Sequence, residues 1–459
     1  MVFCSAIFLF LFLPAIFLLD RSLPSLRARN ILLVFASLFF YAFGEPVYVL
    51  LMLVSMIMNY IWGRLAAGPG KMAKAGVALA VVTNIGLLAG FKYTAFLIGN
   101  LNFIFDVHLP IPEIRLPVGI SFFTFQALSY VIDVYRDPAC CQKHLGKLML
   151  YISFFPQLVA GPIVRYQDIT AQIDQRQTTD QDTAEGIRRF IGGLAKKLLI
   201  ANTVGLGADR IFAVNGGNIV AAWTGAAFYC LQIYYDFSGY SDMAIGLGRI
   251  FGFRFKENFN YPYTAASVQD FWRRWHMSLT GWFRNYLYIP LGGNRKGRAR
   301  TIINQYIVFF MTGLWHGASW NFVLWGLLHG TFLVLENSVL KPLKNHAVSG
   351  RIYTLLAVSL TFVLFRADSL SSGFSYLSCM FTGFQFTDGS WNQFLTVLSP
   401  WMICAGMIGI LLAMPVKRWV QRTLGNCQGI CNAASLALFG LCVLNLSAAT
   451  FNPFIYFRF

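Results

Sequence analysis

The sequence has little charge for its length. Only 12% of its 459 residues are Asp, Glu, Lys or Arg, whereas about 25% is usual in a soluble domain. Hydrophobic residues make up 57%, and the mean hydropathy is +0.58. This charge cannot solvate the surface of a soluble chain, which excludes a soluble enzyme, a disordered protein and a disulfide-stapled secreted module. The apolar runs are continuous, without the alternation that the strands of a transmembrane β-barrel need.

Familiar cofactor and metal motifs are missing. The nine cysteines are scattered and form neither a metal spacing nor a disulfide framework. Cys427-x-x-x-Cys431 has no histidine nearby, and Gly246-x-Gly248 has no strand before it to make a dinucleotide fingerprint. There is no Gly-x-Ser-x-Gly elbow and no His-Glu-x-x-His motif. We therefore expect no metal site and no bound cofactor.

Long apolar runs dominate the chain instead. A spanning helix needs about 20 mainly apolar residues, so the pattern predicts an all-α polytopic membrane protein in one membrane domain, 1–459. The stretch 1–20 lacks a basic n-region and a cleavage site, so it reads as a first span rather than a signal peptide. Proline and glycine interrupt 117–163, where we expect a re-entrant element. The candidate spans are 4–19, 31–43, 47–62, 76–98, 117–134, 146–163, 190–213, 218–235, 302–314, 320–338, 353–366, 396–415 and 433–450.

The net charge of +17 is interpreted as topology rather than nucleic-acid binding. Basic residues cluster after spans 47–62 and 117–134 and before spans 353–366 and 433–450. Cytoplasmic loops carry such an excess of Lys and Arg. This pattern predicts that both termini lie outside the cytoplasm.

The segment 268–300 is basic and aromatic at once. Between Arg273 and Arg300 it holds seven Arg or Lys residues and no acid, interleaved with Trp and Tyr. Two interpretations stay open. It is either an interfacial amphipathic helix held by anionic membrane lipids, or a cytoplasmic element that also binds a polyanionic ligand.

Two of the six histidines are candidates for proton transfer. His316 lies in Gly313-Leu-Trp-His-Gly-Ala-Ser-Trp-Asn321, between two tryptophans in an apolar run. A neutral imidazole in a dry site can take a proton from a hydroxyl, so we predict His316 as a general base. His276, forty residues earlier, is predicted as a second acid/base or orienting group. His329 is interpreted as a packing residue.

A polar stretch interrupts the apolar run near residue 236. Asp236, Ser238 and Asp242 cannot face lipid, so they either line a cavity or bond neighbouring helices. We predict them as cavity-lining residues, together with Trp315 and Asn321, which flank His316.

These motifs resemble the membrane-bound O-acyltransferases, most closely the bacterial AlgI type. The resemblance covers the chain from end to end. It rests on Arg273-Arg-Trp-His-Met-Ser-Leu279, Asn285-Tyr-Leu-Tyr-Ile-Pro-Leu-Gly-Gly-Asn294, Leu314-Trp-His-Gly317, Pro117-Val-Gly-Ile-Ser-Phe122, Ala160-Gly-Pro162 and Asp236-Phe-Ser-Gly-Tyr-Ser-Asp-Met-Ala244.

The resemblance implies a bundle of about 11–13 helices in a bacterial inner membrane, with His316 as the family's catalytic histidine and His276 as the second family histidine. It implies acetyl transfer from a cytoplasmic thioester, with acetyl-CoA as donor, to a cell-surface polysaccharide through a periplasmic SGNH-type partner. Under that reading, the basic segment would pair with coenzyme A phosphates. The candidate donor-binding residues are Arg273, Arg274, Arg295 and Lys296.

The C-terminal stretch 454–459 resembles the Phe-x-Tyr-x-x-Phe tail of some of these transferases. The resemblance implies that Tyr456 carries the acyl group while Phe454, Phe457 and Phe459 seat the tail. The alternative is an aromatic belt at the outer interface.

Two other functions stay open at this stage. One is transfer of D-alanine from a carrier protein, as in the DltB branch of the same family. The other is a transporter for a lipid-linked sugar, which would suit interrupted helices. A transporter would also predict inverted repeats and charges within both halves, and the sequence shows neither.

Overall fold

The computed structural model describes residues 1–159, 161–416, 428–448 and 454. All regular elements in this described part are helices, which confirms the all-α prediction. The chain divides into two compact units. Unit 1 comprises Met1–Phe190 and Ser241–Lys256, and unit 2 comprises Ile191–Tyr240 and Glu257–Phe459. Helices α10 and α12 contribute residues to both units.

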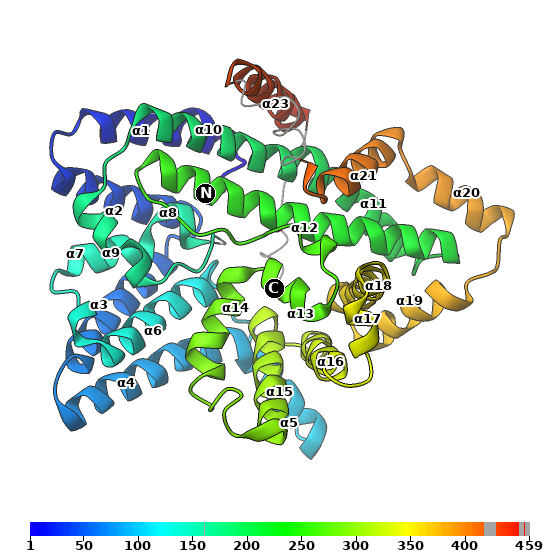
Figure 1. Cartoon of the computed structure of the whole chain (residues 1–459), viewed down its shortest axis with the longest axis horizontal. Coiled ribbons are helices and arrows are strands. Elements are labelled where there is room, and N and C mark those ends of the chain that lie inside the picture. Colours follow the sequence, from blue (N-terminus) through cyan, green and yellow to red (C-terminus); the bar gives the residue numbers. More distant parts are fainter. Residues whose placement is uncertain (160, 417–427, 449–453, 455–459) are drawn as a thin grey trace. The chain divides into compact units, whose positions relative to one another are not determined.

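The helices that start in unit 1 are coloured from blue to green in Figure 1, and the longest connection, 106–119, joins α5 to α6. They are η1 (Phe8–Phe12), α1 (Leu13–Ser22), α2 (Leu26–Ala42), α3 (Tyr48–Ala66), α4 (Gly70–Leu88), η2 (Ala89–Tyr93), α5 (Thr94–Phe105), α6 (Ile120–Arg136), η3 (Pro138–Cys140), α7 (Leu145–Ser153), α8 (Phe155–Leu158), α9 (Tyr166–Gln175) and α10 (Asp180–Ala195).

The helices that start in unit 2 include several short pieces in the middle of the sequence. They are η4 (Lys196–Ala201), α11 (Asn202–Ala213), α12 (Ile219–Ile250), η5 (Pro262–Thr264), α13 (Val268–Arg274), α14 (Met277–Phe283), η6 (Arg284–Tyr288), α15 (Gly297–His316), α16 (Trp320–Glu336), α17 (Lys341–Asn345), α18 (Ala347–Arg366), α19 (Leu370–Thr382), α20 (Asp388–Val397), α21 (Pro400–Leu412) and α23 (Gln428–Ala448).

Several helices are long and apolar enough to cross a membrane. Within the described residues these are Tyr48–Ala66, Gly70–Phe105, Ala347–Arg366 and Gln428–Ala448, and the bent pair α20 and α21 could form a fifth span. They coincide with the predicted spans near 47–62, 76–98, 353–366, 396–415 and 433–450. The chain is therefore a multi-pass membrane protein.

Unit 1 is built around three helices that lie side by side, α3, α4 and α6 (Figure 1). Asn59 on α3 and Asn84 on α4 exchange side-chain hydrogen bonds of 3.2 and 2.8 Å, and both are buried. Polar side chains that bond across helices are a common way to join membrane helices.

The interruptions predicted in 117–163 meet in space. Gly119 precedes α6 with φ +77°, a conformation that favours glycine. A Cβ at this position would lie 2.9 Å from the carbonyl oxygen of Leu158, so only glycine fits. The broken helix pair α7 and α8 is thereby packed against the start of α6. That the segment is re-entrant in the bilayer stays a prediction.

Charged residues join α10 to the end of α12 in unit 1. Asp182 accepts hydrogen bonds from Arg249 and Arg254, both at 3.1 Å. The Thr179 hydroxyl, which donates to Asp182 over 2.8 Å, and these guanidinium groups hold the pKa of Asp182 below its ordinary value. Asp242 pairs with Arg189 at 2.8 Å.

Two glycines let α15 and α16 touch in unit 2 (Figure 1). A Cβ on Gly313 would lie 2.3 Å from the Phe322 carbonyl oxygen, and one on Gly326 would lie 2.2 Å from that of Phe309. Any larger residue would push the helices apart. This contact positions His316, the last residue of α15.

The basic segment 268–300 is not one amphipathic helix. It folds into α13, α14 and η6, followed by a loop and the start of α15. Phe271, Trp275 and Trp282 are buried, whereas Arg273 and Arg284 are exposed. The aromatic side chains pack inside the protein, so the segment is not a single helix that lays its aromatic face on lipid. That it lies at the bilayer surface stays a prediction.

Candidate active site

His316 lies in a box of aromatic rings. Its imidazole is 3% exposed. The ring centroids of Trp315, Trp325 and Phe365 lie 5.0, 5.1 and 5.4 Å away, and all three meet His316 edge to face. Such packing keeps bulk water from the imidazole. The predicted dry environment of His316 is therefore present.

His276 occupies the turn between α13 and α14. Its backbone has φ +44°, which is uncommon for a residue with a side chain, although His is among the types that tolerate it best. The ring is fully buried and meets Phe237 edge to face at 4.6 Å. Residues held in sparsely populated backbone conformations concentrate at functional sites.

Trp315 connects the two histidines. Its ring centroid lies 5.0 Å from that of His316 and 5.9 Å from that of His276. Although forty residues separate them in the sequence, the two candidate acid/base groups thus belong to one site in unit 2.

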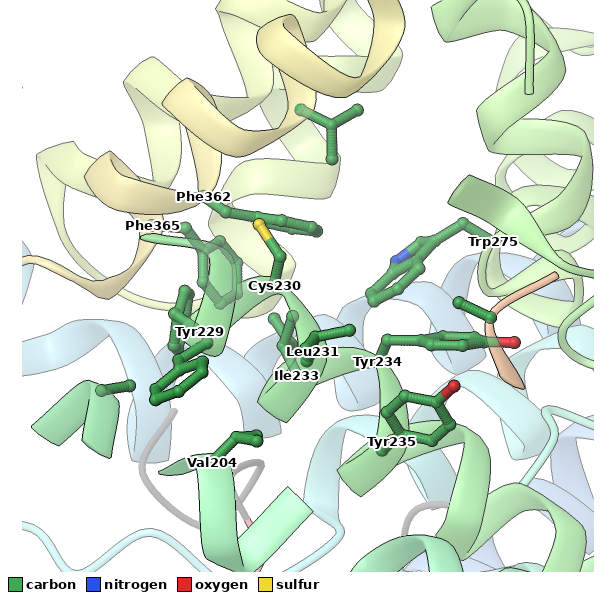
Figure 2. Packing of buried hydrophobic residues seen from close by; sticks show 14 of the residues in the cluster. Val204, Tyr229, Cys230, Leu231, Ile233, Tyr234, Tyr235, Trp275, Phe362 and Phe365 are labelled. Carbon is green, nitrogen blue, oxygen red and sulfur yellow. The ribbon is translucent and has the colours of Figure 1, made fainter. Parts of the chain in front are cut away.

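An aromatic cluster lies beneath this site. Figure 2 shows Trp275, which follows α13, together with Phe362 and Phe365, which both come from α18. Trp275 and Phe362 have ring centroids 5.4 Å apart, and Phe365 contacts His316. The residue before His276 and the ring beside His316 therefore share one rigid core.

His329 is buried, and both of its ring nitrogens have a hydrogen-bond partner. The Trp272 indole donates to its Nδ1 over 3.2 Å, and its Nε2 lies 3.2 Å from the Thr361 hydroxyl. Because Nδ1 accepts, Nε2 carries the proton. The interpretation of His329 as a packing residue is confirmed.

Asn258 holds the His276 turn, and the sequence reasoning missed it. Its backbone carbonyl accepts from Met277 N at 3.0 Å. Its side-chain Oδ1 accepts from Ser278 N and from the Ser278 hydroxyl, at 3.1 and 2.9 Å, and lies 3.3 Å from Nδ1 of His276. No local motif marks this residue.

Glu336 was also missed. This buried carboxylate at the end of α16 accepts the backbone N–H groups of Val268 and Gln269, the latter at 3.0 Å. These are unsatisfied donors at the start of α13, where negative charge is favourable. Glu336 therefore fixes the helix that leads to His276.

The predicted cavity-lining residues have different surroundings. Asp236 forms an ion pair with Lys197, and the Nζ–Oδ1 distance is 2.5 Å. Ser238 is buried on the same helix. Asn321 donates to the carbonyl oxygen of Ala367. Asp242 belongs to unit 1. Of this predicted set the structure brings Trp315 into contact with both histidines, and a cavity-lining role for the others stays a prediction.

The predicted donor-binding residues differ in their exposure and in their ion pairing. Arg273, Arg295 and Lys296 are exposed, whereas Arg274 pairs with Asp270 at 2.9 Å. The buried Asn304 side chain donates to the Gly293 carbonyl oxygen over 2.8 Å, which holds the turn before Arg295. Two of the exposed cations therefore lie on an ordered loop.

The tail is described at one residue. Phe454 is buried, and its ring centroid lies 4.7 Å from that of Tyr240 and 6.4 Å from that of Phe237. Phe237 in turn contacts His276. Tyr456, Phe457 and Phe459 lie outside the described residues.

The helical fold, with helices long enough to cross a membrane, defines the class as an integral membrane protein that buries two histidines against one tryptophan. In the described part of the chain, no group of three or more His, Cys, Asp or Glu side chains could hold a metal. A family model, MBOAT or membrane-bound O-acyltransferase family, matches residues 118–377. The chain belongs to this family and is an O-acyltransferase.

Similar proteins agree with this assignment. The chain is 38% identical to the "Probable alginate O-acetylase AlgI" of Azotobacter vinelandii, with 100% of both chains covered. It is 36% identical to the "Peptidoglycan O-acetyltransferase" of Helicobacter pylori, over 83% of this chain and 80% of that protein. The "Teichoic acid D-alanyltransferase" of Bacillus subtilis is 29% identical over 53% of this chain and 65% of its own length.

Proposed function

We propose that this chain is an O-acetyltransferase that passes acetyl from a cytoplasmic thioester across the membrane to a cell-surface polysaccharide. The observation that carries the proposal is the Trp315 ring in contact with both His316 and His276. A buried base, with a second buried histidine on the same tryptophan, suits proton transfer during acyl transfer.

The reaction begins with attack of a hydroxyl oxygen on the thioester carbonyl carbon. His316 takes the hydroxyl proton as the new C–O bond forms. The C–S bond then breaks, and the proton goes to the departing thiolate, which leaves as a thiol. His276 assists as a second acid/base or orienting group. The reaction needs no metal or bound cofactor for its atoms to balance.

Acetyl-CoA is the proposed donor, bound from the cytoplasm. Its phosphates would pair with the exposed side chains of Arg273, Arg295 and Lys296. Arg274 would contribute less to phosphate binding, because it already pairs with Asp270. Arginine and lysine form strong charge-assisted hydrogen bonds to phosphate.

Tyr456 is the proposed first acceptor of the acetyl group. Phe454 supports this, because it is buried against Tyr240 and Phe237, and Phe237 contacts His276. Two further residues of chain reach at most about 7 Å. A phenol, with a pKa of about 10, leaves more readily than an aliphatic alcohol, so its acetyl ester stays activated for onward transfer. Phe457 and Phe459 would help to seat the tail.

A periplasmic SGNH-type partner would take acetyl from Tyr456 and pass it to the polymer. The names of two relatives, alginate O-acetylase and peptidoglycan O-acetyltransferase, support a polysaccharide of the cell envelope as the final acceptor. Membership of this family and the apolar helices support a bacterial inner membrane location. The clusters of Lys and Arg between the spans support both termini outside the cytoplasm.

D-alanyl transfer is the second candidate. The teichoic acid D-alanyltransferase match spans only about half of this chain, which favours acetyl over D-alanine. The transporter hypothesis has lost its support, because the chain belongs to an acyltransferase family.

The test is thioester consumption by the purified full-length chain in lipid vesicles. We expect thiol release from acetyl-CoA and none from a D-alanyl carrier-protein thioester, with protein-free vesicles as the blank. Thiol release from the D-alanyl carrier alone would support the second candidate. No release from either thioester would contradict acyl transfer.

A further inference from the structure

Oδ1 of Asn258 lies among several polar hydrogens at the His276 turn. It accepts from Ser278 N at 3.1 Å and from the Ser278 hydroxyl at 2.9 Å, and it lies 3.3 Å from Nδ1 of His276. The Asn258 side chain is fully buried. All three residues belong to unit 2, and nothing in the sequence motifs singles out Asn258.

The orientation of the Asn258 amide follows from the backbone. In general the oxygen and nitrogen of an amide side chain are assigned from their hydrogen-bond partners. A backbone N–H can only donate, so the amide atom that faces Ser278 N has to be the oxygen. The group opposite Nδ1 of His276 is therefore an acceptor.

The Ser278 hydroxyl does not change this assignment. A hydroxyl has one proton to donate, and here it points to Oδ1 of Asn258 over 2.9 Å. The Ser278 oxygen is 3.5 Å from Nδ1 of His276, a poor distance for a hydrogen bond. An unprotonated Nδ1 would set its lone pair against that of Oδ1. Nδ1 therefore carries the proton, and Nε2 carries the lone pair.

We propose that Asn258 is a positioning residue that selects the His276 tautomer with Nε2 as the proton acceptor. The inference rests on the proposed role of His276 in acyl transfer. Two backbone hydrogen bonds hold the segment around Asn258 beside the His276 turn. Met277 N donates to Asn258 O over 3.0 Å, and Asn260 N donates to Arg274 O over 2.9 Å. The left-handed conformation of His276 turns its ring towards Asn258.

The charged and titratable groups around His276 matter for a pH test. Phe237, Trp315, Asn258 and Ser278 contact the ring and do not titrate near neutral pH. On the neighbouring elements, the titratable or charged groups include His316 beside Trp315, Glu257 before Asn258 and the Arg274–Asp270 pair on α13. Asp236, which precedes Phe237 on α12, pairs with Lys197 on η4.

The experiment is a pH–rate profile of acetyl-CoA consumption by the full-length protein in vesicles. In Asn258→Asp, a carboxylate accepts the same N–H groups and stabilises the protonated imidazole. The acidic limb should therefore move to higher pH by about one unit or more. Asn258→Leu should lower kcat by about 10- to 100-fold and leave the donor KM unchanged.

Ser278→Ala is the matched control, because it removes the competing hydroxyl and keeps the backbone N–H. Its profile should match that of the wild type. A profile that shifts in Ser278→Ala but not in Asn258→Asp would overturn the proposal, because the serine would then be the partner of Nδ1. Gel-filtration elution and thermal unfolding identify any variant that fails to fold. If Asn258→Leu fails to fold, the pH profile of Asn258→Asp still decides the test.

His276→Ala separates this inference from the proposed function. If that variant keeps wild-type activity, the role of His276 fails and the inference fails with it. If His276→Ala is impaired but Asn258→Asp leaves the pH profile unchanged, only the positioning role is overturned.

Discussion

Nζ of Lys197 lies 2.5 Å from Oδ1 of Asp236, and both side chains are less than 5% exposed. Lys197 belongs to the π-helical turn η4, and Asp236 to α12. The two elements approach closely at Gly239, where a Cβ would lie 3.2 Å from the backbone nitrogen of Lys197. Charges within a membrane domain are costly unless paired, so this pair ties α12 to η4.

Breaking that pair should destabilise the protein more than replacing it. Lys197→Met or Asp236→Leu alone leaves a buried charge and should cost about 3–5 kcal/mol, whereas the double variant should cost less than either. Thermal unfolding in detergent measures this. Arg189→Met is the control, because its pair with Asp242 is more exposed and should contribute about 1 kcal/mol or less. A double variant as unstable as the sum of the singles would contradict the account.

Glu336 should matter for both stability and activity. Glu336→Gln leaves one of the two buried N–H groups of α13 without an acceptor, at a cost of about 1–3 kcal/mol. Because α13 ends next to His276, acetyl transfer should fall as well. The comparison is the exposed Glu113→Gln, which should change neither the melting temperature nor the rate. Equal melting curves for the two variants would refute the capping role.

The exposed basic residues should govern donor affinity. Arg273→Gln, Arg295→Gln and Lys296→Gln should each raise the KM for acetyl-CoA about 3- to 10-fold with little change in kcat. Lys71→Gln, an exposed cation in unit 1, should have no effect. A normal KM combined with less protein in the membrane would indicate a lipid contact instead.

Tyr456→Phe tests the acyl carrier, because it keeps the ring and removes only the nucleophile. We expect loss of polymer acetylation in cells. Wild-type protein isolated without the periplasmic partner should carry labelled acetyl on Tyr456. Phe454→Ala should weaken tail binding and lower the rate without blocking chemistry. Normal polymer acetylation by Tyr456→Phe would rule out the carrier role.

The sequence predicted the parts of the molecule that have a local signal. Apolar runs of spanning length predicted the long helices, and histidines among tryptophans predicted the site that contains His276 and His316. The glycine and proline breaks in 117–163 marked the start of α6 after Gly119 and the short helix α8 around Pro156.

The missed residues act through distant partners. Asn258 meets His276 across 18 residues of chain, and Glu336 meets Val268 across 68. Lys197 lies within the predicted span 190–213, and only the fold shows that Asp236 lies opposite it. The aromatic residues of 268–283 resembled a membrane-surface pattern because periodicity alone does not reveal whether a ring is covered by lipid or by protein.

The central claim is that His316 is the general base, and its removal tests the claim most directly. The measurement is acetyl transfer from labelled acetyl-CoA in vesicles holding equal amounts of inserted wild-type protein, His316→Ala and the control His346→Ala, which changes an exposed histidine. We predict that His316→Ala lowers the rate about 100- to 10,000-fold while His346→Ala leaves it unchanged. A folded, inserted His316→Ala protein with near wild-type transfer would contradict the account.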